Sequence, residues 1–237
     1  MKKFVRTTLV LVFTTLMKKI LLALIFVTMA FHFSSAKEPS LKYTTIMMDD
    51  GPSENTERLL KILKEKNVTI NFNLIAKNVV KHPEEARMIA ESGNIINCHS
   101  LTHTAPADLT DEQLRDEIVK GKQVIEEITG KKIYWYWPPY LSTTPRMDPY
   151  LKEAGMKLCR FDGVISCEDY NKSVTGDQIR ERVINGAKDG SLILLHEWRD
   201  ATLEQLPAII DALRAKGFVF VPYAQWYQYR FVLPNEK

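Results

Sequence analysis

The sequence predicts an α/β fold in which a parallel β-sheet is covered by helices. Short apolar runs of strand length alternate with segments of helical periodicity, an order that is typical of such sheets. After residue 36 no repeat and no low-complexity linker interrupts this alternation. About 200 residues are sufficient for one domain with a full core. We therefore expect a single domain over residues 37–237.

Seven runs are predicted to be strands, because they are short, apolar and bounded by polar or turn-forming residues. In chain order they are residues 43–48, 69–74, 94–98, 133–137, 157–161, 192–195 and 218–221. The helices between them have recognisable ends. The spacing of capping boxes occurs at Thr110 with Gln113, Thr175 with Gln178 and Thr202 with Gln205, and helix C-terminal caps are expected at Gly93, Gly130 and Gly217.

The first 36 residues have the layout of a secretory signal peptide. From residue 17, two lysines precede an apolar run that ends in small residues at 34–36. We expect cleavage after Ala36, and residues 1–16 are interpreted as an upstream extension, because signal peptides begin with their basic residues. A membrane anchor is less favoured, since the lysines divide the apolar stretch into pieces shorter than the ~20 residues of a spanning helix. The sequence predicts a secreted or periplasmic protein with no stable membrane anchor after cleavage.

Charge narrows the class of partner. The whole chain has 32 basic and 29 acidic residues, but its first 36 residues hold five Lys or Arg and no acid. Residues 37–237 therefore carry 27 basic and 29 acidic side chains, a net charge of −2. This balance argues against a nucleic-acid-binding surface and favours a neutral glycan or a small molecule. It does not indicate an oligomeric state.

Three cysteines, Cys98, Cys159 and Cys167, cannot all pair within one chain. A disulfide between Cys159 and Cys167 is an alternative in an oxidising compartment. Buried free thiols are the favoured interpretation, because unpaired cysteines behave as small apolar residues.

Five short patterns occur in one order, and each follows or ends a predicted strand. They are Asp49-Asp50-Gly51-Pro52, His99-Ser100-Leu101-Thr102-His103, Trp137-Pro138-Pro139-Tyr140, Asp169-Tyr170 and Leu192-Ile193-Leu194-Leu195-His196. Function in parallel α/β sheets gathers at the carboxyl ends of the strands, so this placement is separate support for a site. Paired carboxylates, a histidine pair and a further histidine indicate metal-assisted hydrolysis.

Two histidines and one aspartate are the candidate metal ligands. His99 and His103 are four residues apart, so on a helical turn both imidazoles would lie on one side and bind one ion. The pair alone is weak evidence, because this spacing also arises by chance. Asp50 would add a carboxylate oxygen, and two nitrogens, one oxygen and open positions are typical of catalytic zinc.

Asp49 and His196 are the candidate proton-transfer residues. A carboxylate bound to a dication is a poor proton acceptor, so Asp49, beside Asp50, is left to accept a proton from the attacking water. His196 ends a buried strand. Alone, the first pattern could be a surface turn and His196 a structural residue, but together the set fills every role that a metal hydrolase needs.

The five patterns, their order and their spacing resemble the polysaccharide deacetylase family, the NodB-like enzymes of carbohydrate esterase family 4. The resemblance covers nearly all of residues 37–237. It implies a distorted (β/α)7 barrel, related to the eight-unit barrel. It also implies a divalent metal, usually Zn2+ but otherwise Co2+ or Ni2+, and the removal of N- or O-acetyl groups from a polysaccharide.

The resemblance assigns a role to each candidate. It implies a metal site at Asp50, His99 and His103, a general base at Asp49 and a general acid at His196. Leu192 and Leu194 match residues that line the acetyl pocket. The main-chain N–H of Tyr140 matches the donor to the oxyanion.

Two positions depart from the family's patterns. Trp137 stands where the third pattern begins with Arg, and Ser166 stands where the fourth carries an additional Asp. The resemblance implies that this Arg supports the base and that this Asp holds the Arg. A displaced pair, Arg160 with Asp162 on one face of a strand, is an alternative. The departures bear on rate and substrate more than on reaction class.

Aromatic residues concentrate at the expected mouth of the barrel, at Tyr134, Trp135, Tyr136, Trp137, Tyr140 and Trp198. Sugar rings pack their C–H faces on aromatic rings, although some of these residues must fill the core. The predicted substrate-binding residues are Trp137, Pro139, Tyr140, Leu194 and Trp198. His82 lies outside every pattern and is predicted to be at the surface.

The sequence thus predicts a secreted metal-dependent deacetylase of an N-acetylated glycan, either peptidoglycan or a chitin-like oligosaccharide. An O-acetyl esterase of the xylan type would use the same chemistry on another substrate. A glycan-binding pseudoenzyme that lost its Arg is the alternative from another class. An amidohydrolase of a small cyclic amide is disfavoured by the signal peptide.

Overall fold

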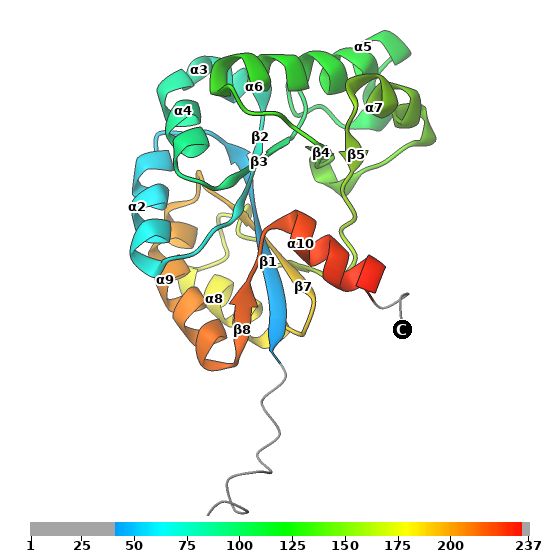
Figure 1. Ribbon diagram of the computed structural model, residues 1–237. Helices are drawn as coiled ribbons and strands as arrows, with labels where there is room; N and C mark the ends of the chain where they lie inside the picture. The colour runs from blue at the N-terminus through cyan, green and yellow to red at the C-terminus, as the bar shows by residue number, and fades with distance from the viewer. Residues whose placement is uncertain (1–40, 234–237) are drawn as a thin grey trace, which may run out of the picture. The chain divides into compact units, whose positions relative to one another are not determined.

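The computed structural model describes residues 41–233 (Figure 1). The predicted signal peptide and its cleavage site lie outside the described residues. Within residues 41–233, no helix is both long and apolar enough to cross a membrane.

An eight-stranded parallel sheet forms the centre of residues 41–233. Its strands are β1 (Lys42–Gly51), β2 (Asn71–Leu74), β3 (Ile95–Cys98), β4 (Trp135–Tyr136), β5 (Lys157–Leu158), β6 (Val164–Ser166), β7 (Ser191–His196) and β8 (Phe218–Phe220). The strands follow the order β5-β4-β3-β2-β1-β7-β6, and β8 pairs with the beginning of β1. The path starts at β5 and ends at β6 without a ladder joining the two. The predicted distorted barrel is confirmed as a curled, open, parallel sheet.

All seven predicted strands are present, but the edges of the sheet differ from the prediction. The strands expected at 133–137 and 157–161 each keep only two residues, as β4 and β5. An eighth strand, β6, was not predicted, because three partly exposed residues are too few for apolar periodicity. Short strands at these edges leave the barrel open on that side.

Helices cover the outer face of the sheet (Figure 1). They are α2 (Thr56–Lys66), α3 (Ala76–Lys81), α4 (Pro83–Glu91), α5 (Asp111–Arg115), α6 (Gly121–Thr129), α7 (Asp148–Ala154), α8 (Gly176–Gly186) and α9 (Asp200–Ala215). A further helix, α10 (Tyr223–Tyr227), packs on the inner face, where Tyr223 and Trp226 contact the smaller core cluster described below. The capping boxes predicted at Thr110 and Thr175 are confirmed. The one predicted at Thr202 is wrong: α9 begins at Asp200, and the Thr202 hydroxyl instead donates to Asp169. The three predicted cap glycines all have left-handed backbone angles.

Buried side chains form a larger cluster, which includes residues of the covering helices, and a smaller one. The smaller cluster contains Met47, Trp137, Cys159, Leu192, Val221, Tyr223 and Trp226. Side chains alternate along a strand, so Asp49 shares a face with Met47, and His196 shares one with Leu192. The smaller cluster therefore lies beneath the polar residues at the carboxyl ends of β1 and β7.

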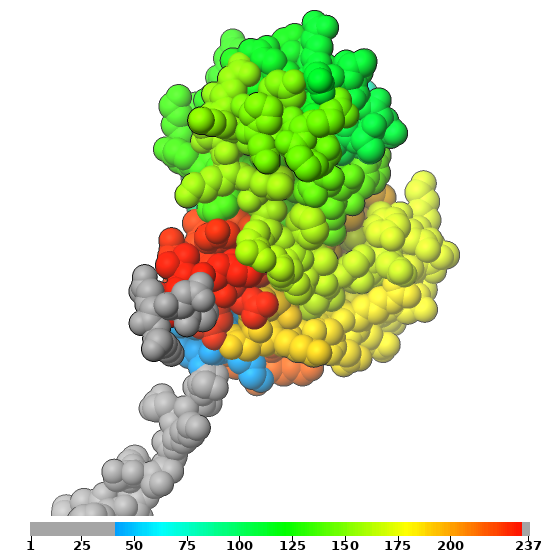
Figure 2. Space-filling model, turned by 90° about the vertical axis from the view of Figure 1, so that its right-hand side faces the viewer, coloured from blue at the N-terminus to red at the C-terminus, as the bar shows by residue number. Residues whose placement is uncertain are grey.

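The C-terminal segment packs beside the loop that follows β5 (Figure 2). The guanidinium of Arg160 lies 4.1 Å from the ring centroid of Phe231, and the Tyr223 hydroxyl donates to the Arg160 carbonyl at 3.0 Å. All three cysteines are buried free thiols, as the sequence favoured.

Candidate active site

Two adjacent carboxylates point toward one site because the backbone turns between them. In a regular strand Asp49 and Asp50 would face opposite sides of the sheet. Asp50 instead has a left-handed φ of 68°, and the β1–β2 register shifts between Asp49 and Gly51. The side-chain amide of Asn78 donates to the Asp50 carbonyl at 2.7 Å and holds this turn. A Cβ at Gly51 would lie 2.5 Å from Glu197 Oε2, so any larger residue there would displace the buried Glu197 side chain.

The histidine pair lies on a loop and not on the helical turn that its spacing predicted. Ser100 and His103 have left-handed φ angles of 71° and 69°, which no α-helix contains. The buried carboxylate of Glu117 holds the loop by accepting the Leu101 and Thr102 N–H groups at 3.0 and 2.8 Å. The imidazoles of His99 and His103 still meet, with ring centroids 4.7 Å apart.

Backbone strain marks the same region independently. Seven non-glycine residues in the described part of the chain have left-handed φ angles, and four of them, Asp50, Ser100, His103 and Tyr140, fall within the first three patterns. Such residues cost about 1–3 kcal/mol each and concentrate at functional sites. The strain therefore supports placing the site here.

Asp50, His99 and His103 can hold a divalent metal ion. Asp50 Oδ1 lies 3.5 Å from His99 Nε2 and 3.4 Å from His103 Nε2. Tetrahedral ligands of zinc are separated by roughly 3.3 Å, given bonds of about 2.0–2.1 Å. Asp50 Oδ1 is also buried without a hydrogen-bond donor, which suits an oxygen that binds a cation. The donor set fits zinc and the other metals predicted.

The ring of His99 is oriented to bind a metal ion. Its Nδ1 lies 2.7 Å from the carbonyl oxygen of Trp137. A carbonyl only accepts, so Nδ1 carries a hydrogen, and Nε2 faces Asp50, where the neutral form of the imidazole offers a lone pair to a cation.

The two aspartates differ in ionisation. Burial raises the pKa of Asp49, against the opposing charges of His99 and His196. Burial also opposes ionisation of Asp50, but without a metal the interaction with a protonated His99 imidazole, 3.5 Å away, outweighs it and holds the Asp50 pKa well below its usual range. Asp49 Oδ1 accepts a hydrogen bond from Asn73 Nδ2 at 2.5 Å, and Asp49 Oδ2 accepts one from Trp137 Nε1 at 2.8 Å. Asp50 is thus the better cation ligand, and Asp49 the better proton acceptor.

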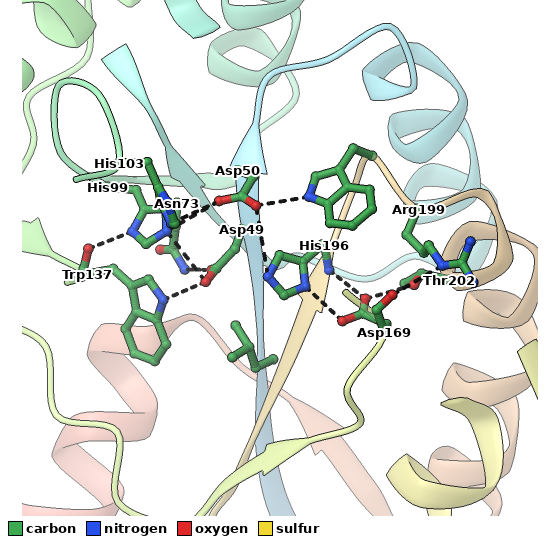
Figure 3. Close-up of polar contacts among 12 residues, drawn as sticks. Asp49, Asp50, Asn73, His99, His103, Trp137, Asp169, His196, Arg199 and Thr202 are labelled. Carbon is green, nitrogen blue, oxygen red and sulfur yellow. Dashed lines mark hydrogen bonds and ion pairs between the residues drawn. The ribbon is translucent and has the colours of Figure 1, made fainter. Parts of the chain in front are cut away.

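His196 lies across Asp50 from His99 and His103 (Figure 3). Its Nδ1–H donates to Asp169 Oδ1 at 2.7 Å, and its Nε2 lies 4.0 Å from Asp50 Oδ2. Burial alone would lower the His196 pKa, but the hydrogen bond and charge of Asp169 outweigh it and raise this pKa to about 9. Sequence reasoning listed Asp169 in the fourth pattern without giving it this partner. The signal available was that pattern alone, because the two residues are 27 positions apart.

Exposed aromatic rings surround the site. Tyr140 is 68% exposed and packs edge-on against His103, with ring centroids 4.6 Å apart. Tyr170 is 55% exposed beside His196, and Trp198 donates its indole N–H to Asp50 Oδ2 at 2.9 Å. Tyr170 was not among the predicted substrate-binding residues.

A hollow of about 330 Å3 adjoins the metal-ligand cluster. Its walls include Asp50, Ser53, Asn78, Lys81, His82, His103 and Trp198. His82, which was predicted to be at the surface, is partly exposed and lines this hollow.

Two further predictions fail for reasons of packing. Trp137, expected to stack on a sugar, is completely buried and offers no exposed ring face. The alternative pair of Arg160 with Asp162 does form as an ion pair, but it lies in the loop after β5, where Arg160 stacks on Phe231 instead of supporting Asp49. Of the other predicted substrate-binding residues, Pro139 is buried and Leu194 is partly buried, while Tyr140 and Trp198 flank the cluster.

Sequence comparison identifies the family. Residues 36–159 match the family model described as polysaccharide deacetylase. The chain belongs to the polysaccharide deacetylase family. It is 30% identical over 199 residues to a peptidoglycan-N-acetylglucosamine deacetylase of Bacillus cereus, a match that covers 80% of this chain and 71% of that protein.

Two more relatives are a much longer enzyme and a domain of known structure. A bifunctional xylanase/deacetylase of Pseudobutyrivibrio xylanivorans is 29% identical over 205 residues, which is 85% of this chain and 33% of that enzyme. The chain thus spans about a third of that relative. The crystal structure of the Xyl-CE4 domain of a multidomain xylanase, from the hindgut metagenome of Trinervitermes trinervoides, superposes with a TM-score of 0.72 at 26% identity. This match covers 83% of this chain and 94% of that one. The predicted family and fold are confirmed.

The metal site can be tested by zinc titration. We expect His103→Ala, and likewise Asp50→Ala, to weaken zinc binding by roughly 100-fold or more, because each removes one of three protein ligands. Isothermal titration calorimetry measures the change. His82→Ala is the matched control, since His82 lines the same hollow outside the ligand cluster. Unchanged zinc affinity in His103→Ala would place the metal elsewhere.

The raised pKa of His196 can be tested by NMR titration of the metal-free protein. Asp169→Asn removes the negative charge and the acceptor that favour the imidazolium, so the His196 pKa should fall from about 9 toward its ordinary value of 6.5. A His196 pKa that stayed near 9 in Asp169→Asn would show that Asp169 does not set it.

Proposed function

We propose that this protein is a secreted metal-dependent deacetylase that removes N-acetyl groups from a glycan. The observation that carries the proposal is the position of the Asp50–His99–His103 cluster between two proton-transfer groups. Asp49 Oδ2 lies 3.7 Å from His99 Nε2 on one side, and His196 Nε2 lies 4.0 Å from Asp50 Oδ2 on the other (Figure 3). Hydrolysis of an acetamide needs a base for the water and an acid for the leaving amine, and this arrangement supplies both.

Asp49 is proposed as the base. A divalent ion, when bound, polarises the acetyl carbonyl and makes a nearby water easier to deprotonate. Asp49 can take that proton, since burial raises its pKa and so makes it a stronger proton acceptor than an exposed carboxylate. Each carboxylate oxygen has two lone pairs, so the hydrogen bonds from Asn73 and Trp137 leave acceptor capacity for water.

His196 is proposed as the acid. A pKa raised to about 9 keeps the imidazole protonated at neutral pH, ready to donate to the sugar nitrogen as the C–N bond breaks. Asp169 fixes the ring by accepting from both Nδ1 and the His196 main-chain N–H. The products are acetate and a free amine on the sugar. The main-chain N–H of Tyr140, beside His103, is proposed to stabilise the oxyanion.

The surroundings of the site support a glycan. Exposed Tyr140, Tyr170 and Trp198 offer ring faces next to the metal-ligand cluster, and aromatic rings pack on the apolar faces of sugars. Residues 1–36 support secretion by their signal-peptide layout. The relatives named above include enzymes of peptidoglycan and of xylan, and an O-acetyl esterase remains the second candidate. A pseudoenzyme is disfavoured, since ligands, base and acid are all present.

Mass spectrometry of glycan fragments incubated with the zinc-loaded protein tests this function. We expect chitin oligosaccharides or peptidoglycan fragments to lose acetyl groups and release acetate. Asp49→Asn should keep zinc yet lose turnover by roughly 100-fold or more, because an amide cannot accept the proton. His196→Ala should harm N-acetyl substrates more than O-acetyl ones, since an amine is the poorer leaving group. If only O-acetylated xylan is hydrolysed, the second candidate is correct.

The hollow beside the cluster bears on which glycan is preferred. Lys81 lines it and forms no ion pair in the described structure, so its ammonium is available to a ligand carboxylate. We expect peptidoglycan fragments, whose stem peptides carry free carboxylates, to be preferred over neutral chitin. Lys81→Ala should raise KM severalfold for the former only. Lys77→Ala, an exposed lysine on the same helix outside the hollow, is the control. Equal effects of Lys81→Ala on both substrates would contradict this preference.

A further inference from the structure

The side chain of Trp137 connects the proposed base to the interior of the protein. Its indole N–H donates to Asp49 Oδ2 at 2.8 Å, although the two residues are 88 positions apart. Its main-chain carbonyl accepts from the Nδ1–H of His99 at 2.7 Å. Trp137 thus contacts both the proposed base and one proposed metal ligand (Figure 3).

Neutral groups hold both oxygens of the Asp49 carboxylate. Asn73 Nδ2 donates to one oxygen and Trp137 Nε1 to the other. Asn73 is itself fixed, because its side-chain oxygen accepts from Asn97 Nδ2 at 2.9 Å. Among the residues described, no Lys or Arg forms an ion pair with Asp49. Its orientation therefore depends on two neutral, directional donors.

Packing fixes the direction of the indole N–H. Trp137 is fully buried in the smaller core cluster with Met47, Cys159 and Leu192. The ring of Phe161 meets it nearly at right angles, at 85° with centroids 6.1 Å apart. A close-packed ring of this size has one accessible rotamer, so its N–H has one direction. The carboxylate that accepts this bond is restrained in turn.

We propose that Trp137 is a positioning residue whose indole N–H fixes the Asp49 carboxylate in the orientation that accepts a proton from the attacking water. The inference rests on the proposed function, in which Asp49 is the base. Without the N–H, the carboxylate can rotate about its Cβ–Cγ bond with only Asn73 to restrain it. Loss of the donor should then lower turnover, whereas substrate binding and zinc binding depend on other side chains.

A second buried tryptophan provides a matched control. Trp226 belongs to the same core cluster, is also fully buried, and donates its indole N–H to the Gly190 carbonyl at 3.0 Å. Loss of either N–H leaves one buried acceptor without its donor. Only the one on Trp137 reaches Asp49, so the pair separates a positioning role from a purely structural one.

The experiment replaces each tryptophan in turn with β-(3-benzothienyl)alanine, which keeps the bicyclic ring and has sulfur in place of N–H. In the full-length, zinc-loaded protein acting on the best N-acetylated glycan, the replacement at 137 should lower kcat about 10- to 100-fold, the scale of a hydrogen bond to a charged group. KM and zinc affinity should not change. The replacement at 226 should lower the melting temperature similarly and leave kcat unchanged.

The possible outcomes are distinct. An unchanged kcat after replacement at 137 in an active protein overturns the role of Trp137 and leaves the proposed function intact. Equal losses of kcat at 137 and 226 also overturn it, since they would reflect general loosening of the core. A wild-type protein that releases no acetate from any glycan overturns the proposed function and, with it, this role of Trp137.

Discussion

The register of the parallel strands is the constraint on which the site depends. Asp49 is paired with His196 on one neighbouring strand and with Asn73 on the other, and Asn73 is paired with Asn97 in turn. Paired residues of parallel strands face the same side of a sheet, so these side chains form one row of polar groups across β3, β2, β1 and β7. A shift of one residue in β1 would turn Asp49 toward the helices and separate it from His196.

This row of polar side chains also depends on one irregularity in the backbone of β1. Asp50 must face the same site as its neighbour, and it does so through a left-handed backbone that costs about 1–3 kcal/mol. Central β1 is paired with β2, β7 and β8, and Asn78 binds the Asp50 carbonyl, so the strain is held in place. The result is two adjacent carboxylates with different partners, one facing two imidazoles and the other facing an indole and an amide. Burial raises the pKa of Asp49, whereas the interaction with His99 holds the pKa of Asp50 well below its usual range.

The sequence predicted what depends on local patterns and failed where tertiary packing decides. Strand runs and motif spacing were sufficient for the parallel sheet and for the grouping of Asp50, His99 and His103. The helical turn expected for the histidine pair was wrong, because the buried Glu117 carboxylate stabilises a loop there. The contact of Asp169 with His196 joins residues from different segments, and no short-range pattern encodes such a contact.

The departure at Trp137 is best understood through the cost of buried charge. A guanidinium at this fully buried position would need a carboxylate partner besides Asp49, and position 166 holds an exposed serine. A neutral indole needs no counterion, fills the core beside Phe161, and still gives Asp49 Oδ2 a donor. The two departures are therefore consistent with each other: without an acidic residue at 166, a neutral donor at 137 satisfies the Asp49 carboxylate at lower desolvation cost than a cation would. The base is then held by the packing of an aromatic core and not by an ion pair.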